Sequence, residues 1–507
     1  MKTNILYVIL TWILATGATA QAVQREYRAV WLTTYLNLDW PLKPTTTPEG
    51  TEQQKQELCT MLDQFVAAGL NTVFVQARMR STVAYKSAYE PWDEAFTGTP
   101  GKAPLYDPLA FAVEECHKRG LECHAWVVAF PICKVPTAKK LGKKALPRLR
   151  PELCQRCGDL WMMDPGVPET ADYLAAICKE IVENYDVDGI HLDYIRYPER
   201  EIRFNDTHTY RKYGKKQNKT TWRRNNVTRC VSAIHTAIKS VRPWVRLSCA
   251  PIGKHDDLSR QSSYGWNART AVSQDAQQWL KTGIMDALFP MMYFDGKHYY
   301  PFAADWQENC YGRPVVPGLG IYFLNKRQRN WPLEVVQRQM NTTRQFGLGG
   351  QAFFRAKFLV DNEKGLYDWL QTQFYTQPAF TPPMTWADSI APKQPKLQIS
   401  HDDVALNLAW KKVSDATPVY YNIYRIDSAD APPRLLAHKL KNLQYRYVPA
   451  LPIHLHAHYS VTAVDAYGNE SAIQPISPHP SQTSDNKQPL SADERLKKVR
   501  EILVGKK

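Results

Sequence analysis

The chain has 507 residues, of which 44% are hydrophobic and 22% are charged, and it holds 64 basic against 49 acidic residues. This length allows two or three domains, and this composition excludes a chain that is disordered throughout. The net charge of +15 is compatible with an acidic partner: nucleic acid, membrane phosphates or an anionic polymer.

The N-terminus, residues 1–20, has the features of a secretory signal peptide. Lys2 precedes an apolar run from Ile5 to Ala15, and Ala18-Thr19-Ala20 offers small residues at a cleavage site. The run is short for a membrane span, so we expect its removal and no stable membrane insertion afterwards. Export across the inner membrane, to the periplasm or the exterior, argues against nucleic acid as a partner.

Between about residues 25 and 375, strand and helix patterns alternate. The expected strands are 25–33, 71–78, 121–130, 189–197, 245–252, 286–293, 314–323 and 349–356. The expected helices are 52–68, 107–119, 168–184, 224–240, 274–282, 332–345 and 362–374, with a weak pattern near 301–310. Eight such repeats predict an α/β fold, a (β/α)8 TIM barrel over residues 25–378. The alternative is an open doubly wound sheet, which would need a glycine-rich phosphate turn after the first strand; WLTTYLNLDWP contains none.

Two segments within this region are strongly basic. One spans residues 134–156 and the other is RKYGKKQNKTTWRR, residues 211–224. They are either solvated loops or a surface for an anionic polymer. The first also contains Cys154 and Cys157, for which a local disulfide is an option in an oxidising compartment.

After a proline-rich hinge, the pattern changes to short alternating runs. Residues 391–478 predict an all-β sandwich of fibronectin type III kind, supported by Trp410 and by the pair Tyr459 and Val461. Such a module spaces domains or binds ligands, and it contains no catalytic set. The tail, residues 481–507, is polar and then basic, and we expect it to be poorly ordered alone.

A barrel has its active site where the strands end, in the loops that lead to the helices. This rule selects a polar and aromatic set of side chains: Trp31, Tyr35, Asp39, Trp40, Gln76, Arg78, Arg80, His124, Trp126, His191, Asp193, Tyr194, Arg196, Ser248, His255, Asp256, Asp257, Tyr293, Asp295, Tyr322, Phe354 and Arg355. Aromatic faces beside carboxyl groups suit a sugar ring. The alternative is that the aromatic residues only pack loops onto the barrel.

Several long motifs resemble the bacterial glycosyl-hydrolase-like family ten. They are RAVWLTTYLNLDWP, NTVFVQARMRSTVAYKSAYEPW, TGTPGKAPLYDPLAFAVEECHKRGLECHAW, NYDVDGIHLDYIRYP and APIGK, within residues 25–375. The resemblance implies a secreted or envelope-associated barrel and a glycoside hydrolase of the cell wall. The family includes an envelope glycosidase that acts on peptidoglycan glycan strands lacking stem peptides. Family members often carry two adjacent acids after the His of the fourth-strand motif, whereas here Tyr194 follows Asp193.

Glycoside hydrolysis generally uses two carboxyl groups, one as an acid and one as a nucleophile or base. Asp193 is the first candidate, with Arg196 expected to hold it ionised. Asp295 is the leading candidate for the acid, because the aromatic residues around it would raise its pKa by desolvation. Glu90, Asp256 and Asp257 are alternatives for that role. A substrate with an N-acetyl group beside the scissile bond could supply the nucleophile itself. An Asp193–Arg196 salt bridge with no catalytic role is the structural alternative.

The remaining candidates would bind substrate: Trp31, Arg78, Trp126, His191, Tyr194, Arg196 and Tyr293. An anionic sugar such as muramic acid, with its lactyl carboxylate, would suit Arg78 or Arg196. Trp40 joins Trp31, Trp126 and Tyr194 as an expected sugar platform, and Arg80 is a further substrate-holding or second-layer candidate. His124 is expected to be a satisfied core histidine. No cofactor is expected.

The sequence therefore predicts a secreted glycoside hydrolase acting on a glycan polymer. One alternative is a carbohydrate-binding envelope protein without catalysis, in which Asp193 only hydrogen-bonds sugar hydroxyls. Another is a metal-dependent hydrolase using His191, Asp193 and His255, although the chain has no HExxH motif and its HxH repeat, His454-Leu455-His456-Ala457-His458, lies in the predicted sandwich. The last is a structural envelope protein whose basic loops hold an anionic polymer.

Overall fold

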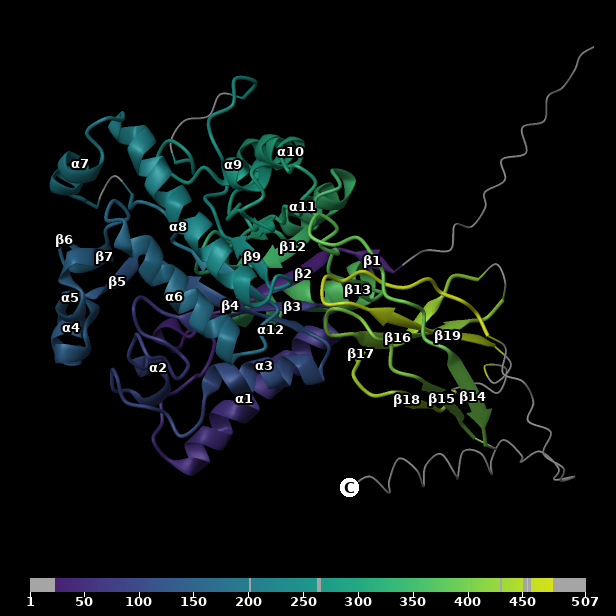
Figure 1. Cartoon of the computed structure of the whole chain (residues 1–507). Helices are drawn as coiled ribbons and strands as arrows, with labels where there is room; N and C mark the ends of the chain where they lie inside the picture. Colours follow the sequence, from purple (N-terminus) through teal and green to yellow (C-terminus); the bar gives the residue numbers. More distant parts are fainter. Residues whose placement is uncertain are drawn as a thin grey trace, which may run out of the picture. The chain divides into compact units, whose positions relative to one another are not determined.

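A computed structural model describes residues 23–199, 202–261, 266–402, 404–428, 431–449, 454 and 457–476 (Figure 1). The predicted signal peptide and the predicted C-terminal tail lie outside these residues. The chain divides into one compact unit, Arg25–Ser389, and a second that contains the residues from Ile390 onward. The domain limits proposed above, 25–378 and 391–478, stay predictions at the level of single residues.

The first unit is a closed parallel barrel, as predicted. Its eight strands, in the order of their hydrogen bonding, are β10 (Ala287–Leu288), β9 (Arg246–Cys249), β8 (Gly189–Asp193), β4 (Glu122–Val128), β3 (Thr72–Arg78), β2 (Tyr27–Leu32), β12 (Gly350–Phe353) and β11 (Gly318–Leu319). Two parallel bridges, Leu288 with Val315 and Met291 with Gly318, join the two ends of this sheet. The ring is therefore complete.

Two strands are much shorter than predicted. Residues 286–293 and 314–323 were expected to be strands, but β10 and β11 have two residues each. Pro290, Pro314 and Pro317 lie in these segments. Proline has no N–H to donate to a neighbouring strand, so the ladder continues only as isolated bridges.

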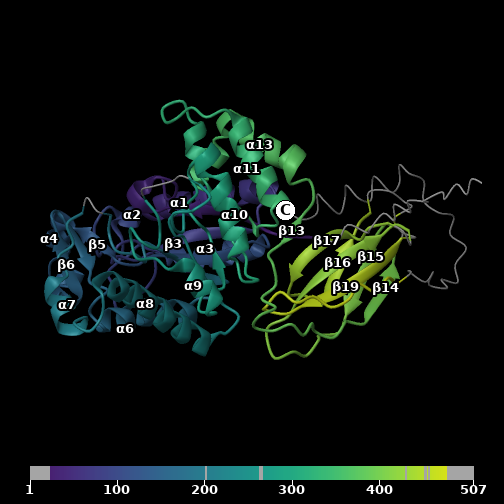
Figure 2. The ribbon, with the colours of Figure 1, turned by 90° about the horizontal axis from the view of Figure 1, so that it is seen from above.

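Helices surround the barrel (Figures 1 and 2). Those that follow successive strands are α1 (Pro48–Ala67), α3 (Pro108–Lys118), α6 (Glu169–Asn184), α8 (Lys219–Val241), α9 (Ala276–Lys281), α10 (Tyr300–Glu308), α11 (Leu333–Gln345) and α13 (Leu366–Trp369), the last continued by a π-helical turn at Leu370–Phe374. Short helices in the loops are α2 (Glu94–Thr97), α4 (Val135–Leu141), α5 (Leu146–Leu149), α7 (Thr207–Tyr213) and α12 (Ala356–Val360). The weakly predicted sixth helix is α10, whose Phe302, Ala303 and Trp306 are buried.

The barrel has two separate apolar cores, because successive side chains of a strand point to opposite faces. On β2, Val30 and Leu32 belong to the outer core, which lies between strands and helices. Tyr27, Ala29 and Trp31 belong to the inner core, which fills the barrel. The large inner side chains are accommodated by small ones opposite, for example Gly318, where an added Cβ would lie 3.1 Å from the Trp31 ring.

Two insertions follow neighbouring strands of the barrel. The first, between β4 and α6, contains α4, α5 and an antiparallel sheet of β5 (Pro131–Lys134), β7 (Leu160–Met163) and β6 (Cys154–Cys157). The second, between β8 and α8, contains α7. Cys154 and Cys157 lie three residues apart on one strand, about 10 Å at ~3.3 Å per residue, which is too far for a disulfide. The suggested local disulfide is therefore wrong, and both cysteines are free thiols.

The second unit contains two antiparallel three-stranded sheets. One is formed by β14 (Leu397–His401), β15 (Leu406–Trp410) and β18 (Gln444–Tyr447), and the other by β17 (Arg434–Leu440), β16 (Tyr420–Ile426) and β19 (His458–Val464). Trp410, Tyr459 and Val461 share one buried cluster. This confirms an all-β module, while its assignment to the fibronectin type III class stays a prediction. A two-stranded pair, β1 (Gln24–Arg25) with β13 (Ala379–Phe380), completes the strands.

Within the described residues, no helix combines the length and the apolar character that a membrane crossing requires.

Candidate active site

Strand β8 carries a column of polar residues on the face that points into the barrel. Gly189, His191 and Asp193 alternate with Ile190 and Leu192, which belong to the outer core. Asp193 is the last residue of the strand, so it lies at the C-terminal end of the barrel, where active sites of this fold are built. The carboxyl group in an otherwise apolar strand is therefore explained by the alternation of the strand.

His191 lies two residues before Asp193, on the same face of β8, and is part of the inner core. Its Nε2 accepts a hydrogen bond of 3.0 Å from the Trp31 indole, so its Nδ1 carries the proton and faces Ser248 Oγ at 2.9 Å. The ring stacks on Phe74, with centroids 4.0 Å apart. Burial lowers the pKa of His191 well below its usual range, and His124 adds to the effect. This neutral imidazole is fully buried and both of its ring nitrogens have protein partners, so the structure places it in the core and not on an accessible surface.

The two predicted tryptophans near Asp193 differ. Trp31 is buried in the inner core and its only donor bonds His191, so it packs the barrel interior and has no accessible face. Trp126, on β4, is also buried, but its Nε1 donates to Asp193 Oδ2 at 3.3 Å. Trp126 therefore positions the carboxyl group. Trp40 is buried in the outer core and bonds Gln54 O at 2.7 Å, which excludes it from a sugar platform.

Asp193 is buried but keeps 9% of its side chain exposed. The Tyr194 N–H donates to Oδ1 at 2.7 Å, and the Arg196 guanidinium lies 3.9 Å from the same oxygen. The pKa of Asp193 is nevertheless raised, because burial outweighs the opposing effects of Arg196, these hydrogen bonds and Arg80. Arg196 favours the ionised form of Asp193, but at 3.9 Å it does not offset the desolvation of the carboxyl group, so the expectation that Arg196 holds Asp193 ionised stays a prediction. The carboxyl group is suited to donate a proton.

Arg196 and Tyr194 cover one side of Asp193. The guanidinium lies over the Tyr194 ring, 4.2 Å from its centroid, and 5.7 Å from that of Trp266. Its Nε and Nη1 are buried, and neither has a hydrogen-bond partner among the described residues. Tyr194 adopts a left-handed backbone conformation, φ 50°, which is uncommon outside glycine and is typical of functional sites. Both residues therefore lie where they were predicted to lie, beside Asp193.

Tyr293, in the segment after β10, lies close enough to Asp193 for the two groups to interact electrostatically. Burial raises its pKa, and the negative charge of Asp193 adds to the rise. Its ring stacks on Phe354, with centroids 5.3 Å apart, and meets Tyr322 edge-on at 5.8 Å. These three half-buried rings form an aromatic wall beside the carboxyl group. Their substrate-binding role stays a prediction.

Arg78 is used by the fold and is unavailable to a substrate. It is fully buried and forms a two-point ion pair with Glu90, with Nε–Oε2 at 2.8 Å and Nη2–Oε1 at 2.7 Å. Its Nη1 donates to the carbonyl oxygens of Val128 and Ala129. Both residues are committed to this buried ion pair, which leaves no free donor of Arg78 for a substrate. The interaction joins β3 to the end of β4.

Asp295, Asp256 and Asp257, the other candidates for the second carboxyl group, are not buried. Asp295 is exposed, so the predicted burial among the neighbouring aromatic residues is wrong. Asp257 is also exposed, and Asp256 pairs with Arg269 at 2.9 Å. In the described part of the chain, the groups that affect the pKa of Asp193 most are Arg196, the Tyr194 N–H, Trp126 and Arg80, none of which is a carboxyl. The identity of a second carboxyl group stays a prediction.

Three further residues complete the description of this end of the barrel. His124 is a buried core histidine, as expected, with Nε2 3.1 Å from Glu122 Oε2. Its buried Nδ1 has no hydrogen-bond partner among the described residues, so the expectation that it is satisfied is wrong. Arg80 lies over the Tyr35 ring and has a left-handed backbone, φ 69°. The sequence analysis did not include Trp266, which is 46% exposed in the structure. A tryptophan between Gly265 and Asn267 in a polar loop is the signal that could have identified it.

Comparison with known proteins gives one family. Residues 26–319 match the model of the family described as glycosyl hydrolase-like 10. The chain is 34% identical over 493 residues to glycosyl hydrolase YngK of Bacillus subtilis, covering 92% of this chain and 96% of the relative. It is 33% identical over 297 residues to glycosyl hydrolase DigH of Escherichia coli, covering 55% of this chain and 67% of the relative.

Among solved structures, the chain is similar to the catalytic domain of a β-amylase from Paenibacillus polymyxa. The TM-score is 0.47 at 12% identity, and the match covers 70% of this chain and 99% of that one.

Proposed function

The chain belongs to the glycosyl hydrolase-like 10 family, and on that premise we propose that it hydrolyses glycosidic bonds of an envelope polysaccharide. The substrate we propose is the glycan strand of peptidoglycan, and the catalytic centre is Asp193. The signal-like N-terminus supports export of the chain to the periplasm or the exterior.

One observation carries the proposal. Asp193 is a carboxyl group at the C-terminal end of a barrel strand, with a raised pKa and a small exposed surface. Glu90, a buried carboxyl group with a structural role, differs from Asp193 because the Arg78 guanidinium lies 2.7 Å from it. A desolvated carboxyl without a partner of that kind costs stability, and such groups are typical of catalytic acids.

In this proposal, Asp193 begins the reaction protonated. It donates its proton to the glycosidic oxygen as the bond from that oxygen to the anomeric carbon breaks. The carbonyl oxygen of the neighbouring N-acetyl group of the sugar then bonds to the anomeric carbon, which removes the need for a second protein carboxyl beside Asp193. Water opens this intermediate, giving up a proton to Asp193, so the acid is restored. Tyr293 and Arg196 would hold the sugar during both steps.

Peptidoglycan fits this scheme because both of its sugars carry N-acetyl groups. The family resemblance implies glycan strands that lack stem peptides, and the curated relatives are named glycosyl hydrolases. A strand without stem peptides exposes a lactyl carboxylate on every muramic acid, and Arg196 could pair with that group.

The decisive experiment compares the mature protein with its Asp193→Asn variant. Each is incubated with purified glycan strands, with and without stem peptides, and the products are read by mass spectrometry. We expect new reducing ends from the wild type only, with a loss of about 10²–10⁴-fold in the variant, as for removal of a general acid. Equal turnover by the variant would disprove the proposal. Binding of strands by both proteins, without products, would establish a carbohydrate-binding protein instead.

Asp295→Asn provides the matched control, since it removes an equivalent carboxyl from an exposed position in the loop after β10. Turnover within about threefold of the wild type would exclude Asp295 as the acid, and a loss comparable to that of Asp193→Asn would restore the two-carboxyl mechanism.

A further inference from the structure

The positive charge of the chain is concentrated in two segments. Of its 64 basic and 49 acidic residues, 15 basic and one acidic residue fall in residues 134–156 and 211–224. The remainder of the chain therefore holds 49 basic and 48 acidic residues, which is an almost neutral balance. Loops that were merely solvated would mix both signs, as the rest of this chain does.

The two segments belong to the insertions that follow β4 and β8, which are neighbouring strands of the barrel. Both insertions therefore leave the barrel side by side and at the same end as Asp193. The Ala129 N–H donates to Asp193 O at 2.8 Å, and the Met163 N–H donates to Phe130 O at 2.8 Å. The first insertion is thus anchored to the candidate catalytic residue through the backbone.

The two insertions also contact each other. Thr209, on α7, donates from its Oγ1 to Oδ2 of Asp164, the residue directly after β7, at 2.5 Å. Arg229 Nη2 donates to Pro165 O at 2.8 Å, and an added Cβ on Gly166 would lie 2.6 Å from the Trp222 ring. Figures 1 and 2 both place α7 beside the β5–β7 sheet. The two insertions therefore lie against each other at one end of the barrel.

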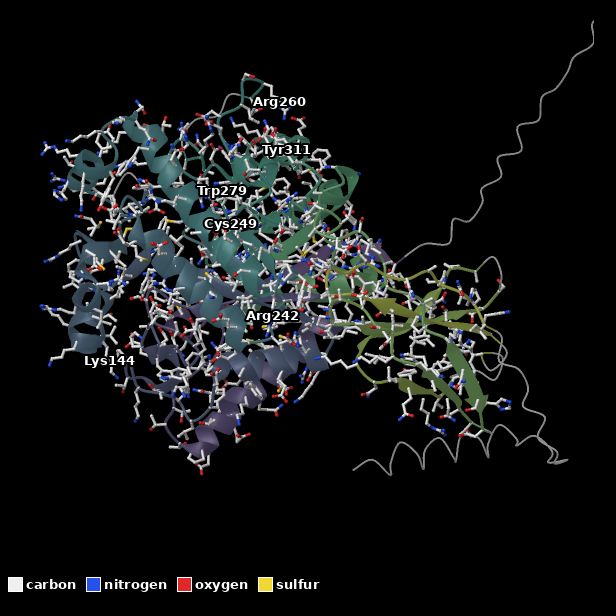
Figure 3. The ribbon with its side chains drawn as sticks, in the orientation of Figure 1. Lys144, Arg242, Cys249, Arg260, Trp279 and Tyr311 are labelled. Atoms are coloured by element: carbon white, nitrogen blue, oxygen red, sulfur yellow. The ribbon has the colours of Figure 1, made fainter. Side chains whose placement is uncertain are left out.

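Most of these basic side chains point into solvent without a carboxylate partner. Arg150 pairs with Glu152, while Lys219 and Arg223 pair with Asp206. We define the basic face as the exposed residues of both segments that have no ion pair among the described residues: Lys134, Lys139, Lys140, Lys143, Lys144, Arg148, Arg156, Arg211, Lys212, Lys215 and Lys216. Lys144 is labelled in Figure 3, at the outer edge of the first insertion.

We infer that the basic face binds a polyanionic glycan strand beside the catalytic site. This inference rests on the proposed function and narrows its substrate to a glycan that carries repeated carboxylates, such as strands freed of stem peptides. Many cations spaced over two insertions suit a polymer with regularly spaced charges better than one small anion. The field of the basic face raises the local concentration of such a strand and weakens as salt screens it.

The test reverses charge on both insertions and measures binding without turnover. In an Asp193→Asn background, Lys143→Glu, Lys144→Glu, Lys215→Glu and Lys216→Glu are combined. The control combines Lys281→Glu, Lys393→Glu, Lys411→Glu and Lys412→Glu, which are exposed lysines outside the two segments. Circular dichroism checks that both proteins are folded. The probe is purified glycan strands without stem peptides, offered as such or after carbodiimide coupling of methylamine to their carboxylates.

We expect the basic-face variant to bind the strands at least about tenfold more weakly, and the control to stay within about twofold of its parent. The parent should lose a similar factor on the amidated strands and at raised salt. In proteins with Asp193 intact, the KM of the basic-face variant should rise more for long strands than for tetrasaccharides.

Equal binding by the basic-face variant and the control would overturn the inference, as would equal binding of amidated and untreated strands. Phosphatidylglycerol vesicles provide a second probe, and binding to them without binding to the strands would also overturn it. These outcomes are separate from those of the proposed function, because they are read as binding. A wild type that binds strands through the basic face but releases no products would leave the surface established and the hydrolase disproved.

Discussion

Asp193 and Glu90 are both buried carboxyl groups, but only Glu90 has a cation at contact distance, namely Arg78 at 2.7 Å. Asp193 has Arg196 at 3.9 Å and hydrogen bonds from Trp126 and the Tyr194 N–H. Glu90 is paired with Arg78, whose Nη1 donates to the carbonyl oxygens of Val128 and Ala129 and so connects β3 to the end of β4. The contacts of Asp193 orient it and leave its pKa raised. This difference separates a structural carboxyl from a reactive one.

The raised pKa of Asp193 predicts a gain in stability when the residue is replaced by asparagine. The folded state binds the proton of Asp193 more tightly than the unfolded state, so stability falls as pH rises from the unfolded pKa through the folded one. Above that window the ionised carboxyl destabilises the fold. We therefore expect Asp193→Asn to raise the free energy of unfolding at neutral pH by about 1 kcal/mol.

Thermal denaturation of both proteins as a function of pH measures this effect. The advantage of Asp193→Asn should shrink as the pH is lowered through the raised pKa of the folded state, since the folded wild-type carboxyl then takes up its proton. A variant less stable than the wild type at neutral pH would show that Asp193 has a net stabilising partner and would argue against the acid role.

Arg78→Ala tests whether Arg78 stabilises the fold or binds substrate. It would leave Glu90 buried without its cation, and breaking a buried ion pair costs about 3–5 kcal/mol. Removing both charges in Arg78→Leu with Glu90→Leu should restore part of that loss. Denaturant unfolding measures the stability of each variant, and steady-state kinetics on glycan strands gives KM. A higher KM for Arg78→Ala with unchanged stability would instead support the original prediction of a substrate-binding arginine.

At the level of elements, strand β8 depends on a glycine that allows a close approach. An added Cβ on Gly189 would lie 2.4 Å from Nδ1 of His124, on the neighbouring strand β4. Side chains inside the barrel are closely packed, so the extra methyl group must displace the imidazole or the strand. Strand β8, which carries Asp193, can therefore lie this close to His124 only because its first residue has no side chain.

Gly189→Ala should destabilise the protein by about 1–3 kcal/mol, as overpacking does in well-packed interiors. It should also reduce kcat, because a displaced β8 misplaces Asp193. Combining it with His124→Ala provides the control, since the smaller side chain makes room for the methyl group. Chemical denaturation and turnover are measured for the single and double variants. If the two single substitutions act independently, their effects on stability add. A double variant that is no more stable than this sum would contradict the proposed clash.

For the whole molecule, the two units have separate apolar cores, one built on the barrel and the other on the two small sheets. A unit with its own core can fold alone. We expect a fragment ending at Ser389 to keep the Tm of the corresponding transition in the full chain, and calorimetry of both proteins checks this. Turnover of glycan strands by the fragment would confine the chemistry to the barrel. A fragment that fails to fold would contradict the independence of the barrel.

The predicted signal peptide gives a second test at this scale. If residues 1–20 are removed on export, N-terminal sequencing of the protein purified from its native envelope should begin at Gln21. A chain that retains Met1 and stays in the cytoplasm would contradict the proposed location and would remove peptidoglycan as an accessible substrate.

The sequence by itself determined the features that depend on local patterns and chain order. Alternating strand and helix periodicity predicted the barrel, and an acid in an apolar strand placed Asp193 at the strand end. The composition of two segments predicted the basic face. The short strands β10 and β11 were overestimated, although Pro290, Pro314 and Pro317 were visible in the sequence.

Only the tertiary structure decided which polar side chains are available to a substrate. His191 is occupied by Trp31, 160 residues away in the sequence, and Arg78 donates to carbonyl oxygens 50 and 51 residues further on. Burial sets the direction of the Asp193 pKa against the nearby Arg196. These effects arise from groups brought together by closure of the barrel. A linear pattern reports which residues share a strand face, but it contains no distance between residues on different strands.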